Sequence, residues 1–383
     1  MLSSLLLKMQ EVDMIIGCPT EVKNNEYRVG LTPSMALDLV SDGHKVLIQK
    51  GAGIGSGFSD ENYRSIGAII KEDGTRVIEN SEMIIKVKEP QKEERQKLTR
   101  GQILFTYLHL AADEEQTSEL MKSKATAFAY ETVTDNFGNL PLLAPMSEVA
   151  GRLAPQMGAW ALQKGNGGAG KLIGGVPGVK PTNILIIGAG VVGTQAALIA
   201  SGMGANVTLM DRSVSRLQYL DQIFFSRFST VYSSNQNIED ALTTADMVIG
   251  AVLIPGAEAP KLVSKKQLSI LPKGSVLVDV AIDQGGCFET SRPTTHENPL
   301  FEINGIVHYC VANIPGTVPH TSTLALTNAT TPYIKKIANE GWKKACKSDK
   351  NLLNGLNVHD GMVTNKPVAK TFELDFTNPK NLI

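Results

Sequence analysis

The sequence predicts an α/β protein of two domains, each built on a sheet of mostly parallel strands. Short apolar runs alternate with charged, helix-compatible segments along most of the chain, which is typical of parallel sheets. The length of 383 residues corresponds to about two domains of ordinary size. Near the middle, a glycine-rich turn lies between two apolar runs, which indicates a doubly wound sheet in that domain.

Composition and charge exclude several classes of protein. Hydrophobic residues make up 42% of the chain and charged residues 20%, as in a globular protein with its own core. The formal net charge of −1 predicts no nucleic-acid partner and no membrane-surface partner. The four cysteines are far apart and lack metal-binding spacing, so we expect reduced thiols, no metal site and a cytoplasmic location. No apolar run approaches the ~18 residues that span a bilayer.

The first part of the chain predicts alternating strands and helices. Residues 1–13 contain only a short apolar run, Leu5–Leu7, and are expected to form a flexible extension. Strands are predicted at Met14–Cys18, Lys45–Gln49, Met83–Lys88, Ile103–His109 and Ala125–Glu131, with helices at Thr32–Ser41, Glu93–Leu98 and Asp113–Lys122. The stretch Pro141–Leu162 is predicted to be a helix that crosses between the domains.

The second part of the chain predicts another α/β unit. Its strands are expected at Ile184–Ile187, Val207–Met210, Met247–Ala251, Val276–Val280 and Val307–Cys310, and a helix is expected at Ser322–Ala338. These elements place a central domain at residues 142–319. The other domain is then discontinuous and consists of residues 14–141 and 320–383.

The glycine-rich turn predicts a dinucleotide site in the central domain. The stretch Asn183–Asp211 reads as strand, G-x-G-x-x-G turn, helix, strand and acid. Gly188 permits the tight turn, Gly190 leaves room for a pyrophosphate and Gly193 lets the helix pack closely on the strand. The free N–H groups at the helix N-terminus favour phosphate. Asp211 can accept hydrogen bonds from a ribose 2′-OH and would repel a 2′-phosphate, so a Rossmann-like domain that binds NAD is predicted over one that binds NADP.

Ionisable side chains follow several predicted strands, at the end where open α/β sheets bind ligands. Lys88, His109 and Glu131 close three of these strands, Asp283 closes a fourth, and Arg28 lies in the polar loop after the first. Taken singly, such residues are more often structural or solvated than catalytic. Together, Arg28 suits a substrate carboxylate, Lys88 a carbonyl oxygen and His109 a moving proton. Asp283 would orient or share that proton, whereas the single carboxylate of Glu131 is weak evidence for a metal.

In the stretches that carry these residues, the chain resembles the alanine dehydrogenase family. The resemblance covers nearly all of residues 14–365 and includes IGCPTEVKNNEYRVGLTP, KVKEP, FTYLHLAA, AYETV, LPLLAPMSEVAGRLA, VDVAIDQGGCFE and HYCVANIPGTVPHTSTLALTNAT. It implies the reversible, NAD-linked oxidative deamination of L-alanine to pyruvate and ammonium. It also implies a homohexamer whose subunits have a substrate domain, a central NAD domain and a cleft that closes on the substrate.

The resemblance also implies roles for individual residues. Arg28 and Lys88 would bind the substrate, and His109 and Asp283 would donate and accept protons. Besides the three glycines, the implied NAD contacts are Ser147, Val191, Val192, Asp211, Arg216, Ser233, Val252, Leu253, Val280, Ala281, Ile282, Asp283, Val311, Ala312, Asn313 and Ile314. Family members often carry Met where this chain has Ile314, so we expect altered packing near the nicotinamide without loss of activity.

Three alternatives stay open at this level. The nearest is the NAD-binding part of a transhydrogenase, a related fold that gives no reason for Arg28, Lys88 and His109 to occur together. A dehydrogenase for another small amino or imino acid would share the cofactor half. A redox-sensing protein could hold NAD(H) without turnover. The sequence leaves open the dominant direction of the reaction and any side activity on glyoxylate.

Overall fold

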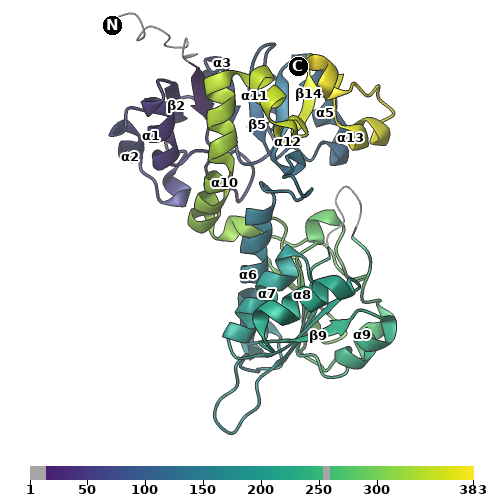
Figure 1. The fold of residues 1–383 in the computed structure, drawn as a ribbon. Coiled ribbons are helices and arrows are strands. Elements are labelled where there is room, and N and C mark those ends of the chain that lie inside the picture. The colour runs from purple at the N-terminus through teal and green to yellow at the C-terminus, as the bar shows by residue number, and fades with distance from the viewer. Residues whose placement is uncertain (1–13, 253–258) are drawn as a thin grey trace, which may run out of the picture. The chain divides into compact units, whose positions relative to one another are not determined.

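The structure is a computed structural model that describes residues 14–252 and 259–383. The chain forms two compact units. The outer unit combines residues 14–145 with residues 318–383, and the central unit consists of residues 146–317. Figure 1 follows the chain from the outer unit through the central unit and back. The predicted extension at residues 1–13 lies outside the described residues.

The outer unit is built on a sheet with the described strand order β15-β14-β6-β5-β4-β1-β2-β3. The strands from β3 to β6 pair in parallel, whereas β14 pairs antiparallel with β6 and β15. The strands are β1 (Ile15–Cys18), β2 (Lys45–Gln49), β3 (Ile69–Lys71), β4 (Met83–Ile85), β5 (Ile103–Thr106), β6 (Thr126–Ala129), β14 (Leu356–His359) and β15 (Met362–Val363). The buried, apolar β4, β5 and β6 form its centre, as expected for parallel strands covered on both faces.

Helices and short 3-10 turns connect the outer strands (Figure 1). The helix α1 starts after Thr32, whose hydroxyl accepts a hydrogen bond from the Met35 amide, and Pro33 suits its first turn. The helices are α1 (Pro33–Ser41), α2 (Asp60–Arg64), α3 (Gly74–Glu79), α4 (Lys92–Arg95), α5 (Glu114–Ser123), α10 (Pro319–Glu340), α11 (Trp342–Ser348), α12 (Lys350–Leu353) and α13 (Lys366–Thr371). The 3-10 turns are η1 (Ile54–Ser56), η2 (Leu110–Ala112), η3 (Tyr130–Thr132) and η8 (Pro379–Leu382).

The central unit has the described strand order β12-β13-β11-β10-β7-β8-β9. All neighbours pair in parallel except β12, which is antiparallel to β13. The strands are β7 (Asn183–Ile187), β8 (Asn206–Asp211), β9 (Ser229–Tyr232), β10 (Met247–Gly250), β11 (Val276–Asp279), β12 (Leu300–Ile303) and β13 (Ile306–Tyr309). The helices are α6 (Ala144–Ala161), α7 (Val191–Gly202), α8 (Val214–Phe224) and α9 (Asn235–Leu242), and the 3-10 turns are η4 (Lys164–Asn166), η5 (Lys266–Ser269), η6 (Ile282–Gln284) and η7 (Ile314–Thr317).

Both sheets reverse direction at an internal strand, and this feature positions the site. In the outer unit the chain runs from β1 to β2 and β3 on one side, then returns to β4 on the other. In the central unit it runs from β7 to β8 and β9, then returns to β10. Ligands of open α/β sheets bind at such reversals, outside the carboxyl ends of the strands. The predicted α/β class with two mostly parallel sheets, the central one doubly wound, is confirmed.

The predicted ends of three strands are wrong by two or three residues. We expected strands to run to Lys88, His109 and Glu131, but β4, β5 and β6 end at Ile85, Thr106 and Ala129. The strand β11 ends at Asp279, one residue before the predicted Val280, and Asp283 lies on the turn beyond it. The apolar runs continue into turns that are themselves buried, so hydrophobicity alone overestimates strand length. The candidate side chains therefore lie on turns beyond the strands.

Within the described residues, no helix combines the length and the apolar character that crossing a membrane requires.

Candidate active site

The glycine loop after β7 is shaped by two glycines that the fold itself requires. Gly188 has a φ of +106°, and its amide donates to the Met210 carbonyl at 2.7 Å. A Cβ at Gly188 would lie 2.7 Å from the Ala251 carbonyl oxygen. A Cβ at Gly193 would lie only 1.7 Å from the Gly188 carbonyl oxygen, so α7 packs against the loop too closely for any side chain. These two positions serve the turn and the helix packing.

Gly190 differs, because nothing in the described fold requires a glycine there. Its φ is −69° and its ψ −162°, a conformation open to other residues, and a Cβ would meet no described atom within 4 Å. Gly190 precedes α7, and no described side chain caps this helix. Val191 and Val192 thus begin a helix whose N–H groups face open space, an arrangement that fits the pyrophosphate of a dinucleotide.

Two charged side chains hold the glycine loop from the β8 side. The Asp211 carboxylate accepts hydrogen bonds from the Ala189 and Ser213 amides, each at 2.7 Å. The Arg216 guanidinium on α8 donates to the Ala189 carbonyl at 2.8 Å and to the Thr194 hydroxyl at 3.1 Å. Both groups therefore shape the loop as well as bordering it. Ser233, just past β9, donates its amide to the Asp211 carbonyl at 2.9 Å.

Asp283 lies on a turn after β11 that is closed by a second carboxylate. Asp279 is buried and accepts hydrogen bonds from the amides of Ala281 at 3.1 Å, Cys287 at 2.8 Å and Phe288 at 3.3 Å. Burial raises the pKa of Asp279, although these hydrogen bonds oppose the shift. Asp283 itself is exposed, and both of its carboxylate oxygens lie 3.4 Å from the Asn313 amide.

The other expected cofactor residues lie mainly at the same end of the central sheet. Val252 follows β10, Val280–Asp283 follow β11, and Val311–Ile314 follow β13, whereas Ser147 is half-buried on α6. Leu253 lies outside the described residues. Two buried polar atoms near these turns, Gln284 Oε1 and His296 Nε2, have no hydrogen-bond partner among the described residues. Buried polar atoms without a hydrogen-bond partner are uncommon in protein cores, and a bound polar ligand could supply the missing hydrogen bonds here.

In the outer unit, Arg28 is buried and engaged. Its side chain is 2% exposed, and it donates to Glu26 through Nε at 2.6 Å and through Nη2 at 2.5 Å. Burial alone would lower the pKa of the guanidinium, but the paired Glu26 carboxylate raises it above its ordinary value. Arg28 is therefore a fixed cation, whereas its place in a polar loop suggested a solvated one. Sequence reasoning missed Glu26.

A buried lysine lies beside Lys88, and sequence reasoning missed it. Lys86 is 1% exposed, and its ammonium lies 3.2 Å from Glu21 and 2.7 Å from Glu94. The Glu21 carboxylate also accepts from the Val87 amide at 2.6 Å and from the Lys88 amide at 3.4 Å. Burial raises the pKa of Glu21 and Lys86 opposes that rise, while the two carboxylates raise the pKa of Lys86 against its own burial. This network fixes the backbone that presents Lys88.

His109 occupies a left-handed turn between β5 and η2. Its backbone has a φ of +50°, and its ring stacks on Tyr107 with the centroids 5.8 Å apart. Glu131, just past β6, accepts from the His109 amide at 2.6 Å and from the Leu108 amide at 3.2 Å. Burial raises the pKa of the Tyr107 phenol far above its ordinary value, so it stays neutral.

Four neighbouring strands thus present the outer candidates. Arg28 follows β1, Lys88 follows β4, His109 follows β5 and Glu131 follows β6, and these strands are adjacent in the sheet. A fixed guanidinium and a half-exposed imidazole that follow neighbouring strands can bind a small carboxylate and move a proton. Among the described residues, no group of three or more His, Cys, Asp or Glu could hold a metal ion.

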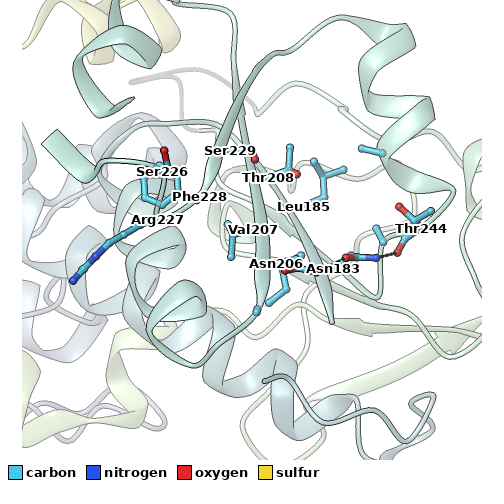
Figure 2. A pocket seen from close by; sticks show the side chains of 14 residues that line it. Asn183, Leu185, Asn206, Val207, Thr208, Ser226, Arg227, Phe228, Ser229 and Thr244 are labelled. Atoms are coloured by element: carbon cyan, nitrogen blue, oxygen red, sulfur yellow. Dashed lines mark hydrogen bonds between the residues drawn. The ribbon is translucent and has the colours of Figure 1, made fainter. Parts of the chain in front are cut away.

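A pocket in the central unit lies at the opposite end of the sheet. It has a volume of about 430 Å³ and is lined at the amino ends of β7, β8 and β9 by Asn183, Asn206 and Ser229 among others. Figure 2 shows these side chains with Thr244, whose carbonyl oxygen accepts from the Asn183 amide group at 3.1 Å. Because ligands of such sheets bind at the carboxyl ends of the strands, this pocket is not the candidate site.

Comparison with known proteins gives matches along nearly the whole chain. Residues 17–150 match the family model "Alanine dehydrogenase/PNT, N-terminal domain", and residues 154–366 match "Alanine dehydrogenase/PNT, C-terminal domain". The chain is 54% identical over 370 residues to an alanine dehydrogenase of Halomonas elongata, a match that covers 97% of this chain and 100% of the relative. It is 50% identical over 370 residues to an alanine dehydrogenase of Mycobacterium tuberculosis, with the same coverage.

Solved structures agree with this result. A structure of L-alanine dehydrogenase superposes with a TM-score of 0.91 at 49% identity and covers 94% of this chain and 99% of its own. A transhydrogenase from Sinorhizobium meliloti superposes with a TM-score of 0.78 at 23% identity and covers 92% of this chain and 99% of its own. The second likeness shows a shared fold.

Proposed function

This chain belongs to the alanine dehydrogenase/PNT family, and we propose that it catalyses the reversible, NAD-dependent oxidative deamination of L-alanine to pyruvate and ammonium. The observation that carries this proposal is the identity of 50–54% to alanine dehydrogenases over 97% of the chain. The match includes the segments that carry Arg28, Lys88 and His109 as well as the glycine loop. A shared fold alone would not specify the reaction.

Substrate binding is assigned to Arg28 and Lys88. A substrate carboxylate at Arg28 would join an existing ion pair with Glu26, so the guanidinium is held in place before the substrate arrives. The Lys88 ammonium would bind the carbonyl oxygen of pyruvate and stabilise the negative charge that develops there during reduction. The Glu21–Lys86–Glu94 network supports this arrangement, because it fixes the turn after β4.

Proton transfer is assigned to His109 and Asp283. Bound NAD⁺ supplies the hydride acceptor for the Cα–H bond of alanine. His109 would take a proton from the water that attacks the resulting iminium carbon, and would later return a proton to the nitrogen that leaves as ammonia. Asp283 would be the second proton-transfer group. Its exposure and its place just beyond β11 in the cofactor-binding unit support this role.

The cofactor is assigned to the carboxyl end of the central sheet. The open space at Gly190 and the uncapped start of α7 fit a pyrophosphate, and Asp211 ends the next strand where a ribose would lie. The remaining proposed contacts are Ser147, Arg216, Ser233, Val252, Leu253, Val280–Asp283 and Val311–Ile314. The Asp211 carboxylate supports NAD over NADP, because it would repel a 2′-phosphate.

We also propose a cytoplasmic homohexamer. All four cysteines are free and buried, and burial raises the pKa of each thiol to about 12, so they stay protonated and unreactive. This suits a reducing compartment. The hexameric assembly follows the family resemblance and is tested by light scattering of the purified protein.

The competing proposals are a dehydrogenase for another small amino acid and an NAD(H) sensor without turnover. One assay separates them from the main proposal. Purified protein is mixed with NAD⁺ and L-alanine at alkaline pH, and the absorbance of NADH is followed. Formation of NADH supports alanine dehydrogenase, formation only with another amino acid supports the first alternative, and NADH binding without any turnover supports the sensor.

A further inference from the structure

The turn that carries His109 is held in an unfavourable conformation. His109 lies in the left-handed region of backbone conformation, with φ +50° and ψ +38°. Residues other than glycine adopt this region at a cost in conformational free energy. Only three residues separate the end of β5 at Thr106 from the start of η2 at Leu110. A strained backbone persists where its surroundings fix it, so the groups that hold this turn bear directly on the proposed proton donor.

Glu131 provides the main fixation of the turn. Its Oε1 accepts hydrogen bonds from the His109 amide at 2.6 Å and from the Leu108 amide at 3.2 Å, and its Oε2 also lies 3.2 Å from the Leu108 amide. On the other side, the buried Gln116 side chain donates to the Leu108 carbonyl at 2.6 Å. Hydrogen bonds to a charged acceptor are stronger than neutral ones, so the carboxylate dominates this arrangement.

The same carboxylate also faces the imidazole ring. His109 Nδ1 lies 3.9 Å from Glu131 Oε1, beyond hydrogen-bond distance but close enough for the carboxylate to attract a protonated ring. The Glu131 side chain is 14% exposed and that of His109 50%, so the ion pair would be only partly screened by water. The ring is stacked on Tyr107, whose hydroxyl donates to the Leu142 carbonyl at 2.6 Å. The described contact of the ring with Glu131 is made by Nδ1, which leaves Nε2 for the exchange of a proton.

We propose that Glu131 is the positioning residue for His109. It holds the left-handed turn through two backbone amides, and its charge stabilises the imidazolium that forms during turnover. Nε2 then exchanges protons: its lone pair takes one proton from water as the water oxygen bonds to the iminium carbon and the C=N π pair moves to nitrogen. Nε2 returns this proton to the nitrogen. As the C–N bond breaks and ammonia leaves, the hydroxyl oxygen forms the carbonyl and passes its remaining proton to Nε2. This inference rests on the proposed function, because it needs His109 to be the proton donor and acceptor.

Two substitutions separate the hydrogen bonds of Glu131 to the backbone from its negative charge. Glu131→Gln keeps an oxygen that can accept from the backbone amides but removes the charge, whereas Glu131→Asp keeps the charge with a shorter side chain. Glu119 serves as the matched control, because it is a carboxylate of similar exposure (19%) in the same unit whose described ion pair is with Arg95 instead of with His109. Glu119→Gln should leave kcat unchanged.

The test is a double-mutant cycle on steady-state kinetics with L-alanine and NAD⁺. Glu131→Gln should lower kcat by roughly 10- to 100-fold while the dissociation constant of NADH and the midpoint of thermal unfolding stay unchanged. In a His109→Ala background the same change should lower kcat by less than about twofold, because a positioning residue acts only through its partner. Glu131→Asp should restore part of the kcat that Glu131→Gln loses.

Three results would overturn the proposal. The first is a multiplicative loss, in which Glu131→Gln lowers kcat equally with and without His109. The second is a wild-type kcat in Glu131→Gln. The third is a loss of kcat that is fully accompanied by weaker NADH binding and a lower unfolding midpoint. If wild-type protein forms no NADH from L-alanine, the proposed function itself fails and this inference fails with it.

Discussion

Substitution of Gly190 by alanine distinguishes a glycine kept for a ligand from one kept for the fold. The Gly190 backbone, with φ −69° and ψ −162°, is open to alanine, and the added methyl would meet no described atom within 4 Å. A compatible Gly→Ala change restricts the unfolded chain and typically stabilises by about 0.4–1 kcal/mol. We therefore expect Gly190→Ala to unfold at the same temperature as the wild type or slightly higher.

Binding of NADH should respond in the opposite sense. If the pyrophosphate lies against the loop, the methyl group displaces it from at least one backbone N–H group of α7. A hydrogen bond to a charged group contributes about 1.5–3 kcal/mol, so the dissociation constant of NADH should rise by roughly 10- to 100-fold. Titration of NADH fluorescence measures this constant, and differential scanning fluorimetry measures the unfolding temperature.

Two other glycines serve as controls. Gly202, the last residue of α7, would also place its Cβ in open space among the described atoms, so Gly202→Ala should leave NADH binding unchanged. Gly193→Ala puts a Cβ 1.7 Å from a backbone oxygen and should destabilise the protein by about 1–3 kcal/mol or more. Two results would contradict a ligand-binding role of Gly190. One is wild-type NADH affinity in Gly190→Ala, and the other is an unfolding temperature of Gly190→Ala as low as that of Gly193→Ala.

Three further predictions concern the charged residues. His109→Ala should lower kcat for alanine oxidation by roughly 10²–10⁴-fold, and an unchanged kcat would remove it from proton transfer. Asp211→Ala and Asp211→Asn should both raise the ratio of kcat/KM for NADP⁺ to that for NAD⁺. Both should also be less stable than the wild type, the alanine variant more so, because each carboxylate oxygen accepts from one amide. Lys86→Met leaves the Glu21 and Glu94 carboxylates without their buried cation and should cost about 3–5 kcal/mol of unfolding free energy at neutral pH. Burial raises the pKa of Glu21 in the folded state, so protonation of Glu21 favours the folded state. The cost of Lys86→Met should therefore shrink as the pH falls through that raised pKa. Urea unfolding at two pH values measures this change.

The cofactor half of the site could be read from the sequence because its constraints are local. Gly188 and Gly193 are required by contacts within one strand-turn-helix unit, and the spacing of the motif encodes those contacts. Asp211 follows the next strand at the expected distance. What the sequence did not indicate is that Asp211 and Arg216 both bind Ala189, since those hydrogen bonds depend on how α8 packs beside the loop.

The substrate half was harder to predict because its partners come from distant segments. The pattern KVK gives no sign that Lys86 is buried while Lys88 is partly exposed, since this depends on Glu21 and Glu94. Glu26 lies two residues from Arg28 in an irregular loop, where no periodic pattern predicts a pair.

The same limit applies to short edge elements. The strands β9 and β12 were missed, because STVY and LFEI are only four residues long and partly exposed. Their positions follow from pairing with β8 and β13, which a local pattern does not encode.

The proposed NAD-dependent oxidation of L-alanine is tested most directly by the kinetics of NADH formation over a panel of small L-amino acids. Wild-type protein is assayed with L-alanine, glycine, L-serine, L-valine and L-lysine, each with NAD⁺ and with NADP⁺. If the protein is an NAD-dependent alanine dehydrogenase, kcat/KM is highest for L-alanine with NAD⁺, and pyruvate and NADH form in equal amounts. NADH binding without turnover of L-alanine, or a clear preference for another amino acid, would contradict this proposal.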